Sequence, residues 1–331
     1  CTGARRAACC RSRPAAMLTL GIDTSNYATS LAVFDTNAGE VVCDCKKFLP
    51  VKAGQLGLRQ SDALFHHTAA LPDLLAELGT KADLTQIGAV GVSAKPRPVE
   101  GSYMPCFLAG VNAAAAFALG KGIPLIHTTH QQGHIAAALF ATGERELFEQ
   151  ENLVFHVSGG TTDLLLCQGA EHITPLGTSQ DLYAGQAVDR LGVKLGYPFP
   201  AGVYVSEQAA QCTEKVHPKV SVKGVNCSLS GLENQYTKLL AEGKDPAYVC
   251  KYCLICVAET LTRMARAALE DHPGLPVVFA GGVMSSDLIR TYVSARVPGA
   301  RFVPGKFASD NAIGVSILAA REQGAWQTTS M

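Results

Sequence analysis

Three histidines lie close together in the stretch IHTTHQQGH, at His127, His130 and His134. The chain has only nine histidines, so this grouping is the first candidate for chemistry. His130 and His134 are four residues apart, and on a helix they would lie one turn apart on the same face. Two imidazoles in that arrangement can bind one metal ion. The alternative is a pair of histidines on the solvent face of an amphipathic helix, and the spacing alone does not decide between the two.

Two similar strand–turn–strand patterns are expected to form the framework that positions the histidine stretch. From Met17 the chain reads MLTLGIDTSNYATSLAVFD, an apolar strand, a small polar turn and a second strand. The same strand–turn–strand pattern recurs in NLVFHVSGGTTDLLLCQG, about 135 residues later. Each pattern precedes a stretch in which helices alternate with strands such as VGVSA and LPVVFAGG. This duplication predicts two α/β lobes facing a cleft rather than one sheet.

Paired glycines follow two of the predicted strands. Gly159 and Gly160 allow the backbone to approach a ligand closely, with amide N–H groups directed at phosphate oxygens. Gly281 and Gly282, after LPVVFA, can serve the other side of a nucleotide. One Gly-Gly turn is usually only a turn, but turns that cap strands in a duplicated scaffold predict an actin-like ATPase fold (the ASKHA, ribonuclease H-like class). Such a fold would hold a nucleotide between its lobes.

Composition limits the class of protein. The 331 residues are 47% hydrophobic and 17% charged, as expected of a compact protein with room for two lobes of about 100–200 residues. Lysine and arginine number 28, and so do aspartate and glutamate, so no overall positive field indicates a nucleic acid. A nucleic-acid partner would require a local basic patch or a second protein that supplies one.

The first sixteen residues differ from the rest because they hold four arginines, three cysteines and no acid. We predict a disordered or non-native extension over residues 1–16; a transit peptide is the alternative. An N-terminal α/β lobe is then predicted over 17–127, joined by a C-terminal helix over 311–324. A second α/β lobe over 128–310 would carry the metal and the nucleotide. No apolar stretch has the unbroken length that spans a membrane.

Cysteines indicate the compartment. Twelve cysteines without a secretory signal favour a reducing, cytoplasmic location, where thiols serve as small core residues. The run CKYCLIC contains Cys250, Cys253 and Cys256, a spacing that also occurs in metal-cluster motifs. It lies inside a sequence with the character of one long helix, and no fourth cysteine follows in a suitable loop. We therefore predict that these thiols face the core.

Seven segments, in order and at similar spacing from Met17 onward, make the chain similar to the TsaD family. This family comprises the tRNA N6-adenosine threonylcarbamoyltransferases, once called glycoproteases (peptidase family M22). The HQQGH element and the SGG turn are the most specific of the matches. The segments are LGIDTS (20–25), GIPLIHTTHQQGHI (122–135), VSGGT (157–161), AGQAVDRLGVKLGYP (184–198), SLSGL (228–232), FAGGV (279–283) and SDNAIGV (309–315).

The resemblance implies a set of site residues. Its metal ligands correspond to His130, His134 and Asp310, and some members add a ligand at the position of His156. The alternative for His156 is a strand histidine that faces the core. The resemblance and the glycine turns together place nucleotide contacts at Val157, Ser158, Gly159, Gly160, Asp189, Gly202, Gly281, Gly282 and Ser286. Asp189 suits a ribose hydroxyl; its alternative is a surface carboxylate paired with Arg190 or Lys194.

The resemblance also implies a reaction and its participants. A threonylcarbamoyl, or a related carbamoyl, group would pass from an adenylate to N6 of the adenosine next to the tRNA anticodon. The cofactors implied are one divalent metal per subunit, iron or zinc first, and an adenine nucleotide: AMP, ATP or the acyl-adenylate itself. Histidine and aspartate ligands also suit manganese. The partners implied are tRNA, a related actin-like-fold protein and an ATPase, and no membrane.

Several positions depart from the family pattern. An acid within the histidine motif is replaced by Gln132, and the histidine after SGG by Thr161. A Gly-Pro-Gly turn becomes AKPRPVEG, with Arg97 among its residues. Ser286 replaces an asparagine and Glu233 a lysine. These changes concern the surroundings of the acyl group more than the metal or nucleotide contacts, so we predict a divergent paralogue.

Three other functions fit parts of the sequence. A metalloprotease would need a glutamate within the histidine helix, where this chain has Gln131 and Gln132. An ATP-dependent phosphotransferase or carbamoyltransferase acting on a small molecule would need a carboxylate in the cleft. Asp23 is the candidate for that phosphate or carboxylate role, although such an aspartate also bonds to nearby turn amides. A noncatalytic paralogue that partners a true synthase is the third, and the retained metal ligands argue against it.

Overall fold

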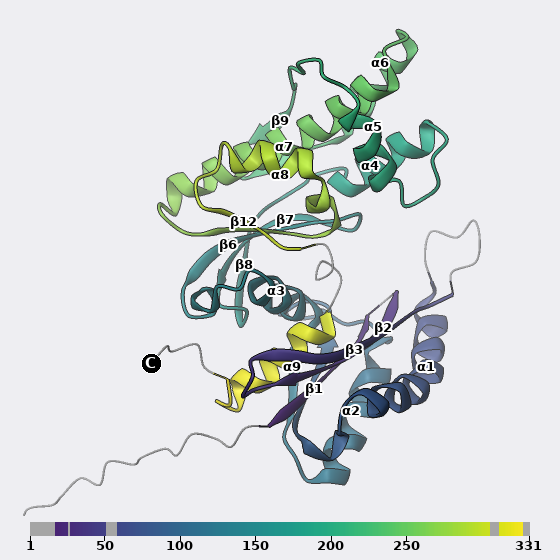
Figure 1. The fold of residues 1–331 in the computed structure, drawn as a ribbon, viewed down its shortest axis with the longest axis vertical. Helices are drawn as coiled ribbons and strands as arrows, with labels where there is room; N and C mark the ends of the chain where they lie inside the picture. The colour runs from purple at the N-terminus through teal and green to yellow at the C-terminus, as the bar shows by residue number, and fades with distance from the viewer. Residues whose placement is uncertain (1–16, 26, 51–57, 305–310, 327–331) are drawn as a thin grey trace, which may run out of the picture. The chain divides into compact units, whose positions relative to one another are not determined.

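Two compact units make up the part of the chain that the computed structural model describes, residues 17–25, 27–50, 58–304 and 311–326. The first unit contains the described residues up to His130 and those from Val315 onward; the second contains the described residues from Gln131 to Gly314. Figure 1 labels most of the helices and strands of both units. The division falls at residue 130, three residues beyond the limit that the sequence analysis places at 127.

The first unit is built on a five-stranded mixed sheet in the order β3-β2-β1-β4-β5. The β1–β2 and β2–β3 pairs are antiparallel, and β4 and β5 continue the sheet in parallel on the other side of β1. Its strands are β1 (Leu18–Ser25), β2 (Ala28–Asp35), β3 (Glu40–Phe48), β4 (Ile87–Lys95) and β5 (Leu125–Thr129).

Helices cover both faces of this sheet. Alternate residues of β1 and β4, such as Leu20 and Val90, pack with the apolar faces of α1 (Gln60–Lys81) and α2 (Phe107–Lys121). On the other face, the Thr19 hydroxyl donates to the Ser316 carbonyl oxygen (2.9 Å) of α9 (Asn311–Glu322). A 3₁₀ turn, η1 (Leu84–Gln86), leads into β4.

The second unit repeats the topology. Its sheet has the order β12-β11-β6-β7-β8, with β6–β7 and β7–β8 antiparallel and β11 and β12 parallel to β6. The duplicated α/β architecture predicted from the two strand–turn–strand patterns is therefore confirmed. The strands are β6 (Glu151–Val157), β7 (Thr162–Gln168), β8 (His172–Thr178), β11 (Val277–Ala280) and β12 (Ala300–Phe302).

One long helix, α7 (Pro246–Asp271), forms the centre of the second unit's core. The thiols of Cys250, Cys253 and Cys256 are buried in that core, which confirms the prediction of core packing. The other helices are α3 (His130–Ala141), α4 (Ala184–Lys194), α5 (Gly202–Ala210), α6 (Ser230–Ala241) and α8 (Asp287–Ser294). The shorter elements are η2 (Arg145–Phe148), η3 (Gly282–Ser285), β9 (Ser221–Lys223) and β10 (Asn226–Ser228).

Helices α3 and α9 meet where two glycines face each other. A Cβ atom at Gly314 would collide with the carbonyl oxygen of Gly133, so only a glycine allows the two backbones to come this close. Across the described ranges, no helix combines the length and the apolar character that crossing a membrane requires.

Candidate active site

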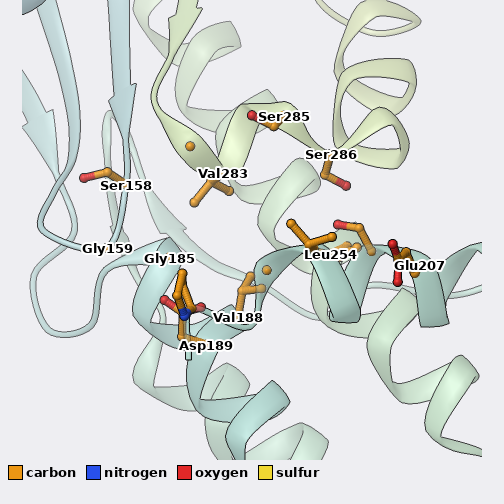
Figure 2. A pocket seen from close by; sticks show the side chains of 15 residues that line it. Ser158, Gly159, Gly185, Val188, Asp189, Glu207, Leu254, Val283, Ser285 and Ser286 are labelled. Atoms are coloured by element: carbon orange, nitrogen blue, oxygen red, sulfur yellow. The ribbon is translucent and has the colours of Figure 1, made fainter. Parts of the chain in front are cut away.

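A cavity of about 450 Å³ lies in the second unit, and all its lining residues belong to that unit. Its volume falls within the range of small-molecule sites, roughly 300–1,000 Å³. Figure 2 shows Ser158, Gly159, Gly185 and Asp189 on one side of the space, and Leu254, Ser286 and Glu207 on the other. The first group offers backbone and polar atoms, and the second offers an apolar side chain, a hydroxyl and a carboxylate.

The turn after β6 forms part of the first side. The Ser158 N–H donates to the Thr161 carbonyl oxygen (2.8 Å), and the Gly160 N–H donates to Ser158 Oγ (3.1 Å), which closes a tight turn. Gly159 is exposed, and a Cβ atom there would have no described atom within 4 Å. Backbone and hydroxyl groups at such a turn can bind an anion such as phosphate.

Helix α4 packs directly on this turn. The Gly185 N–H donates to the Ser158 carbonyl oxygen (3.1 Å), and the Ala184 N–H donates to Thr162 Oγ1 (2.9 Å). A Cβ atom at Gly185 would lie 2.5 Å from the Gly159 nitrogen. Because Gly185 has no side chain, the first turn of helix α4 can pack directly against the backbone of Ser158 and Gly159.

Asp189 lies one turn further along α4. Its Oδ1 accepts a hydrogen bond from the Ala201 N–H (2.8 Å) at the start of α5. Burial raises the pKa of Asp189 above its ordinary value, although the Ala201 and Gly202 amides act against burial. The carboxylate lines the cavity in a fixed position, where it can accept a hydrogen bond from a ligand hydroxyl.

Apolar side chains also line the cavity. Val188, Leu254 and Val283 line it, which suits the flat face of a nucleobase. Ser286 is 7% exposed, and its buried Oγ has no hydrogen-bond partner among the described residues. A buried hydroxyl without a partner is costly, and a rotation of the Ser286 side chain would be needed to present it to a ligand in the cavity.

The structure brings together most of the nucleotide contacts expected from the sequence. Three predicted residues lie elsewhere: Val157 is buried in the core, and Gly160 is on the exposed side of the turn. Gly281 has a φ of 102°, and its Cβ would collide with the Val157 carbonyl oxygen, so it serves a close approach between backbones. Those that line the cavity are Ser158, Gly159, Asp189, Gly202, Gly282 and Ser286.

Sequence reasoning missed several lining residues. Gly185 precedes Asp189 by four positions on α4, and this helical spacing was a signal that could have found it; the spacing gives no such signal for Val188. Leu254 comes from the middle of α7, and Glu207 comes from α5. For these two, the sequence carries no signal beyond amphipathic helices.

His130 begins α3 and bonds to Asp23. The distance from its Nδ1 to Asp23 Oδ2 is 2.9 Å, and Asp23 is fully buried. Burial opposes ionisation of Asp23, but the attraction of His130 and hydrogen bonds from its neighbours outweigh burial and lower the pKa of Asp23 to about 2. The Asp23 carboxylate is thus ionised at neutral pH and lies against Nδ1 of the His130 imidazole.

His134 and His156 face each other within the second unit. Their ring centroids are 4.6 Å apart. Phe155 and Val157 belong to the core, so the alternation of β6 places His156 on the opposite face of the sheet, beside α3. Asp310, the fourth predicted ligand, lies outside the described residues. Within the described ranges, no three histidine, cysteine, aspartate or glutamate side chains form a metal-binding group.

Two residues at departures from the family pattern, Gln132 and Thr161, make structural hydrogen bonds. Gln132 Nε2 donates to the Glu171 carbonyl oxygen (2.9 Å). The hydroxyls of Thr161 (2.5 Å) and Thr178 (2.7 Å) each donate to one carboxylate oxygen of Asp163, which lies directly across from His156 in the β6–β7 pair. Asp163 is a further carboxylate at the histidine pair that the sequence analysis missed.

Similar folds occur in solved structures. Full-length HypF in a phosphate- and nucleotide-bound form aligns with a TM-score of 0.61 over 94% of this chain and 47% of that one, at 10% identity. Component A of (R)-2-hydroxyglutaryl-CoA dehydratase from Acidaminococcus fermentans aligns with a TM-score of 0.54 over 92% and 98%, at 15% identity. The chain has the two-lobed α/β fold of the actin-like ATPase class, as predicted.

Sequence comparison identifies the family. The model of the TsaD family, tRNA N6-adenosine threonylcarbamoyltransferase, matches residues 51–316. A protein of that name from Streptococcus suis (strain 05ZYH33) is 29% identical over 92% of both chains. Another, from Streptococcus pneumoniae (strain CGSP14), is 32% identical over 75% of both. The chain belongs to the TsaD family of acyltransferases.

Proposed function

We propose that this protein transfers a threonylcarbamoyl group from an adenylate to N6 of the adenosine next to the tRNA anticodon, with the help of a bound metal ion. The observation that carries the proposal is the cavity of the second unit. It combines a glycine turn suited to phosphate, the Asp189 carboxylate, several apolar side chains and the unpartnered Ser286 hydroxyl. These features match the three parts of an adenylate.

The nucleotide would lie with its phosphate at Gly159 and its base against the apolar side chains of the cavity. Asp189 would accept a hydrogen bond from a ribose hydroxyl, and Val188 and Leu254 would cover the face of the adenine. After a rotation of its side chain, Ser286 Oγ would bond to a ring nitrogen, which would satisfy that buried hydroxyl. The acyl group, attached to the phosphate, would then project past the Ser158–Gly160 turn.

The reaction needs no nucleophile from the protein, because the acyl-adenylate is already activated. The N6 amine attacks the carbonyl carbon, and a C–N bond forms while the bond from that carbon to the phosphate oxygen breaks. AMP leaves with the electron pair, and N6 loses a proton. The protein contributes by orienting the carbonyl and by stabilising the charge of the departing phosphate.

We propose His130, His134, His156 and Asp310 as the ligands of the metal ion. The contact between the rings of His134 and His156 and the carboxylate behind His130 fit an ion that prefers imidazole nitrogen, such as zinc or ferrous iron. Such an ion would supply Lewis acidity toward the phosphate or the carbonyl oxygen.

A small-molecule phosphotransferase has less support. Such an enzyme would need Asp23 to meet the phosphate or the acceptor. Asp23 is fully buried, its Oδ2 is bonded to His130, and its Oδ1 accepts from the Ser25 N–H (3.0 Å). A carboxylate with both oxygens engaged inside the protein is poorly placed to act on a substrate.

Calorimetric titration with AMP tests the nucleotide site. Wild-type protein should bind AMP, and Gly159→Val should lower the affinity at least tenfold, because the branched side chain occupies the place of the phosphate. The space around Gly159 is open, so the variant should stay folded. Adenosine, which has no phosphate, is the control ligand and should lose less affinity. Equal AMP affinity in both proteins contradicts the proposed site.

A direct assay tests the transfer. Chemically prepared threonylcarbamoyl-adenylate is mixed with the protein, its partner proteins and tRNA lacking the modification, and the nucleosides are analysed by mass spectrometry. Threonylcarbamoyl-adenosine should form with wild-type protein and not with Gly159→Val. If AMP binds but no modified nucleoside appears, the nucleotide site stands and the proposed acyl group or acceptor is wrong.

A further inference from the structure

Asp23 lies near the end of β1, and the sequence marks it as the candidate for a phosphate or carboxylate role. The structure gives it a different environment. Its side chain is fully buried, and the end of β1 is fixed to the start of α2. The Gly110 N–H donates to Thr24 Oγ1 (3.1 Å), and that hydroxyl donates to the Cys106 carbonyl oxygen (3.1 Å). Asp23 therefore sits on a rigid support.

Both oxygens of Asp23 are engaged by neighbours in the first unit. Oδ1 accepts from the Ser25 N–H (3.0 Å), and Oδ2 lies 2.9 Å from His130 Nδ1. The ring of Phe107 meets the His130 ring edge-on, with centroids 6.1 Å apart, and limits its rotation. The carboxylate and the phenyl ring together fix the orientation of the imidazole.

The hydrogen bond also decides which nitrogen of His130 carries the proton. An ionised carboxylate only accepts hydrogen bonds, so Nδ1 must be the donor and must carry hydrogen. In a neutral imidazole the lone pair then lies on Nε2. An imidazole binds a metal through the nitrogen that carries the lone pair, while its other N–H is held by a carboxylate or a carbonyl.

We propose that Asp23 is a positioning residue: it holds His130 in the Nδ1–H form, with Nε2 as the metal-binding nitrogen, and it does not contact nucleotide or substrate. The part that concerns metal rests on the proposed function. The part that concerns the proton on His130 is a property of the metal-free protein, so the two can fail separately.

The test compares wild-type protein with Asp23→Asn, which keeps the shape of the side chain and removes its charge. Asparagine can present an amide donor to Nδ1 and so favour the other tautomer. Long-range ¹⁵N NMR of the metal-free protein should show His130 as the Nδ1–H form in wild type and as the Nε2–H form or a mixture in the variant. Zinc affinity, measured by competition with a chelator, should fall about 10–100-fold.

Asp35→Asn provides a matched control. Asp35 ends β2, and its Oδ1 accepts from the Asn37 (2.8 Å) and Ala38 (3.1 Å) amides of an exposed turn. The same chemical change there should leave the His130 signals and the zinc affinity unchanged. AMP affinity should be unaffected by either variant, because Asp23 is proposed to have no contact with nucleotide.

Three results would overturn the proposal. The first is an Nε2–H form of His130 in metal-free wild type, and the second is an unchanged tautomer in Asp23→Asn. The third is a loss of AMP affinity in Asp23→Asn with an unchanged tautomer, which would return Asp23 to a phosphate-contacting role. If wild type shows the Nδ1–H form but binds no zinc or ferrous iron, the metal in the proposed function is wrong, and so is the part of this proposal that concerns it.

Discussion

Replacing Gly185 by alanine should distort the proposed nucleotide site, because it displaces the turn at Ser158 and Gly159. The added Cβ would lie 2.5 Å from the Gly159 nitrogen, 2.6 Å from the Ser158 carbonyl carbon and 2.7 Å from the Ser158 oxygen. All three are backbone atoms, so no side chain can rotate away. An ordinary contact begins near 3.4 Å, so α4 and the turn must separate by about 1 Å.

Two effects of that displacement can be estimated. Overpacking of this kind typically costs about 1–3 kcal/mol of unfolding free energy. A shift of about 1 Å in a positioning element can cost a factor of 10² in function, so AMP affinity should fall by 10-fold or more. Denaturant unfolding measures the first effect, and calorimetric titration with AMP measures the second.

Gly231→Ala is the matched control. Gly231 is the second residue of α6, as Gly185 is of α4, but a Cβ atom there has no described atom within 4 Å. That variant should be neutral, or more stable by up to about 1 kcal/mol, since alanine is the better helix former. An unchanged AMP affinity together with an unchanged denaturation midpoint in Gly185→Ala would refute the predicted clash.

Three further predictions follow from contacts elsewhere. Gly314→Ala should destabilise the protein by at least about 1–3 kcal/mol in denaturant unfolding, because its Cβ would collide with the Gly133 carbonyl oxygen. Burial outweighs the attraction of Asp23 and lowers the pKa of His67 to about 4, so only the unfolded state gains a proton there as the pH falls below about 6.5. Stability should thus fall between pH 6.5 and 4 by up to about 3 kcal/mol, and His67→Gln should flatten that slope. His156→Ala should weaken zinc binding and leave the melting temperature of the metal-free protein nearly unchanged; early melting with normal zinc affinity would make His156 a core residue.

Local sequence patterns were sufficient to predict several secondary-structure elements of this protein. Alternation and turn residues located the strand pairs β1–β2 and β6–β7, because a half-buried strand shows its period of two within a few residues. Helical spacing placed His130 and His134 on α3 and the three thiols on the buried side of α7 for the same reason. Recurrence of the strand–turn–strand pattern was sufficient to predict a duplicated fold.

Tertiary structure decided which groups the candidate site residues contact. Asp23 and His130 are 107 positions apart in the sequence. No local pattern of residues indicates that the Asp23 carboxylate forms a hydrogen bond with the His130 imidazole. The sequence likewise marked Gly281 as a ligand contact, whereas its left-handed φ and its approach to Val157 give it a backbone role. Gly185 is a single glycine that the sequence does not distinguish from others. Its importance follows only from the packing of α4 against the turn at Gly159. The periodicity of a sequence indicates which face of a helix or strand is buried. Only the packing of the whole chain determines which groups from different elements come into contact, and hydrogen bonds and steric clashes depend on those contacts.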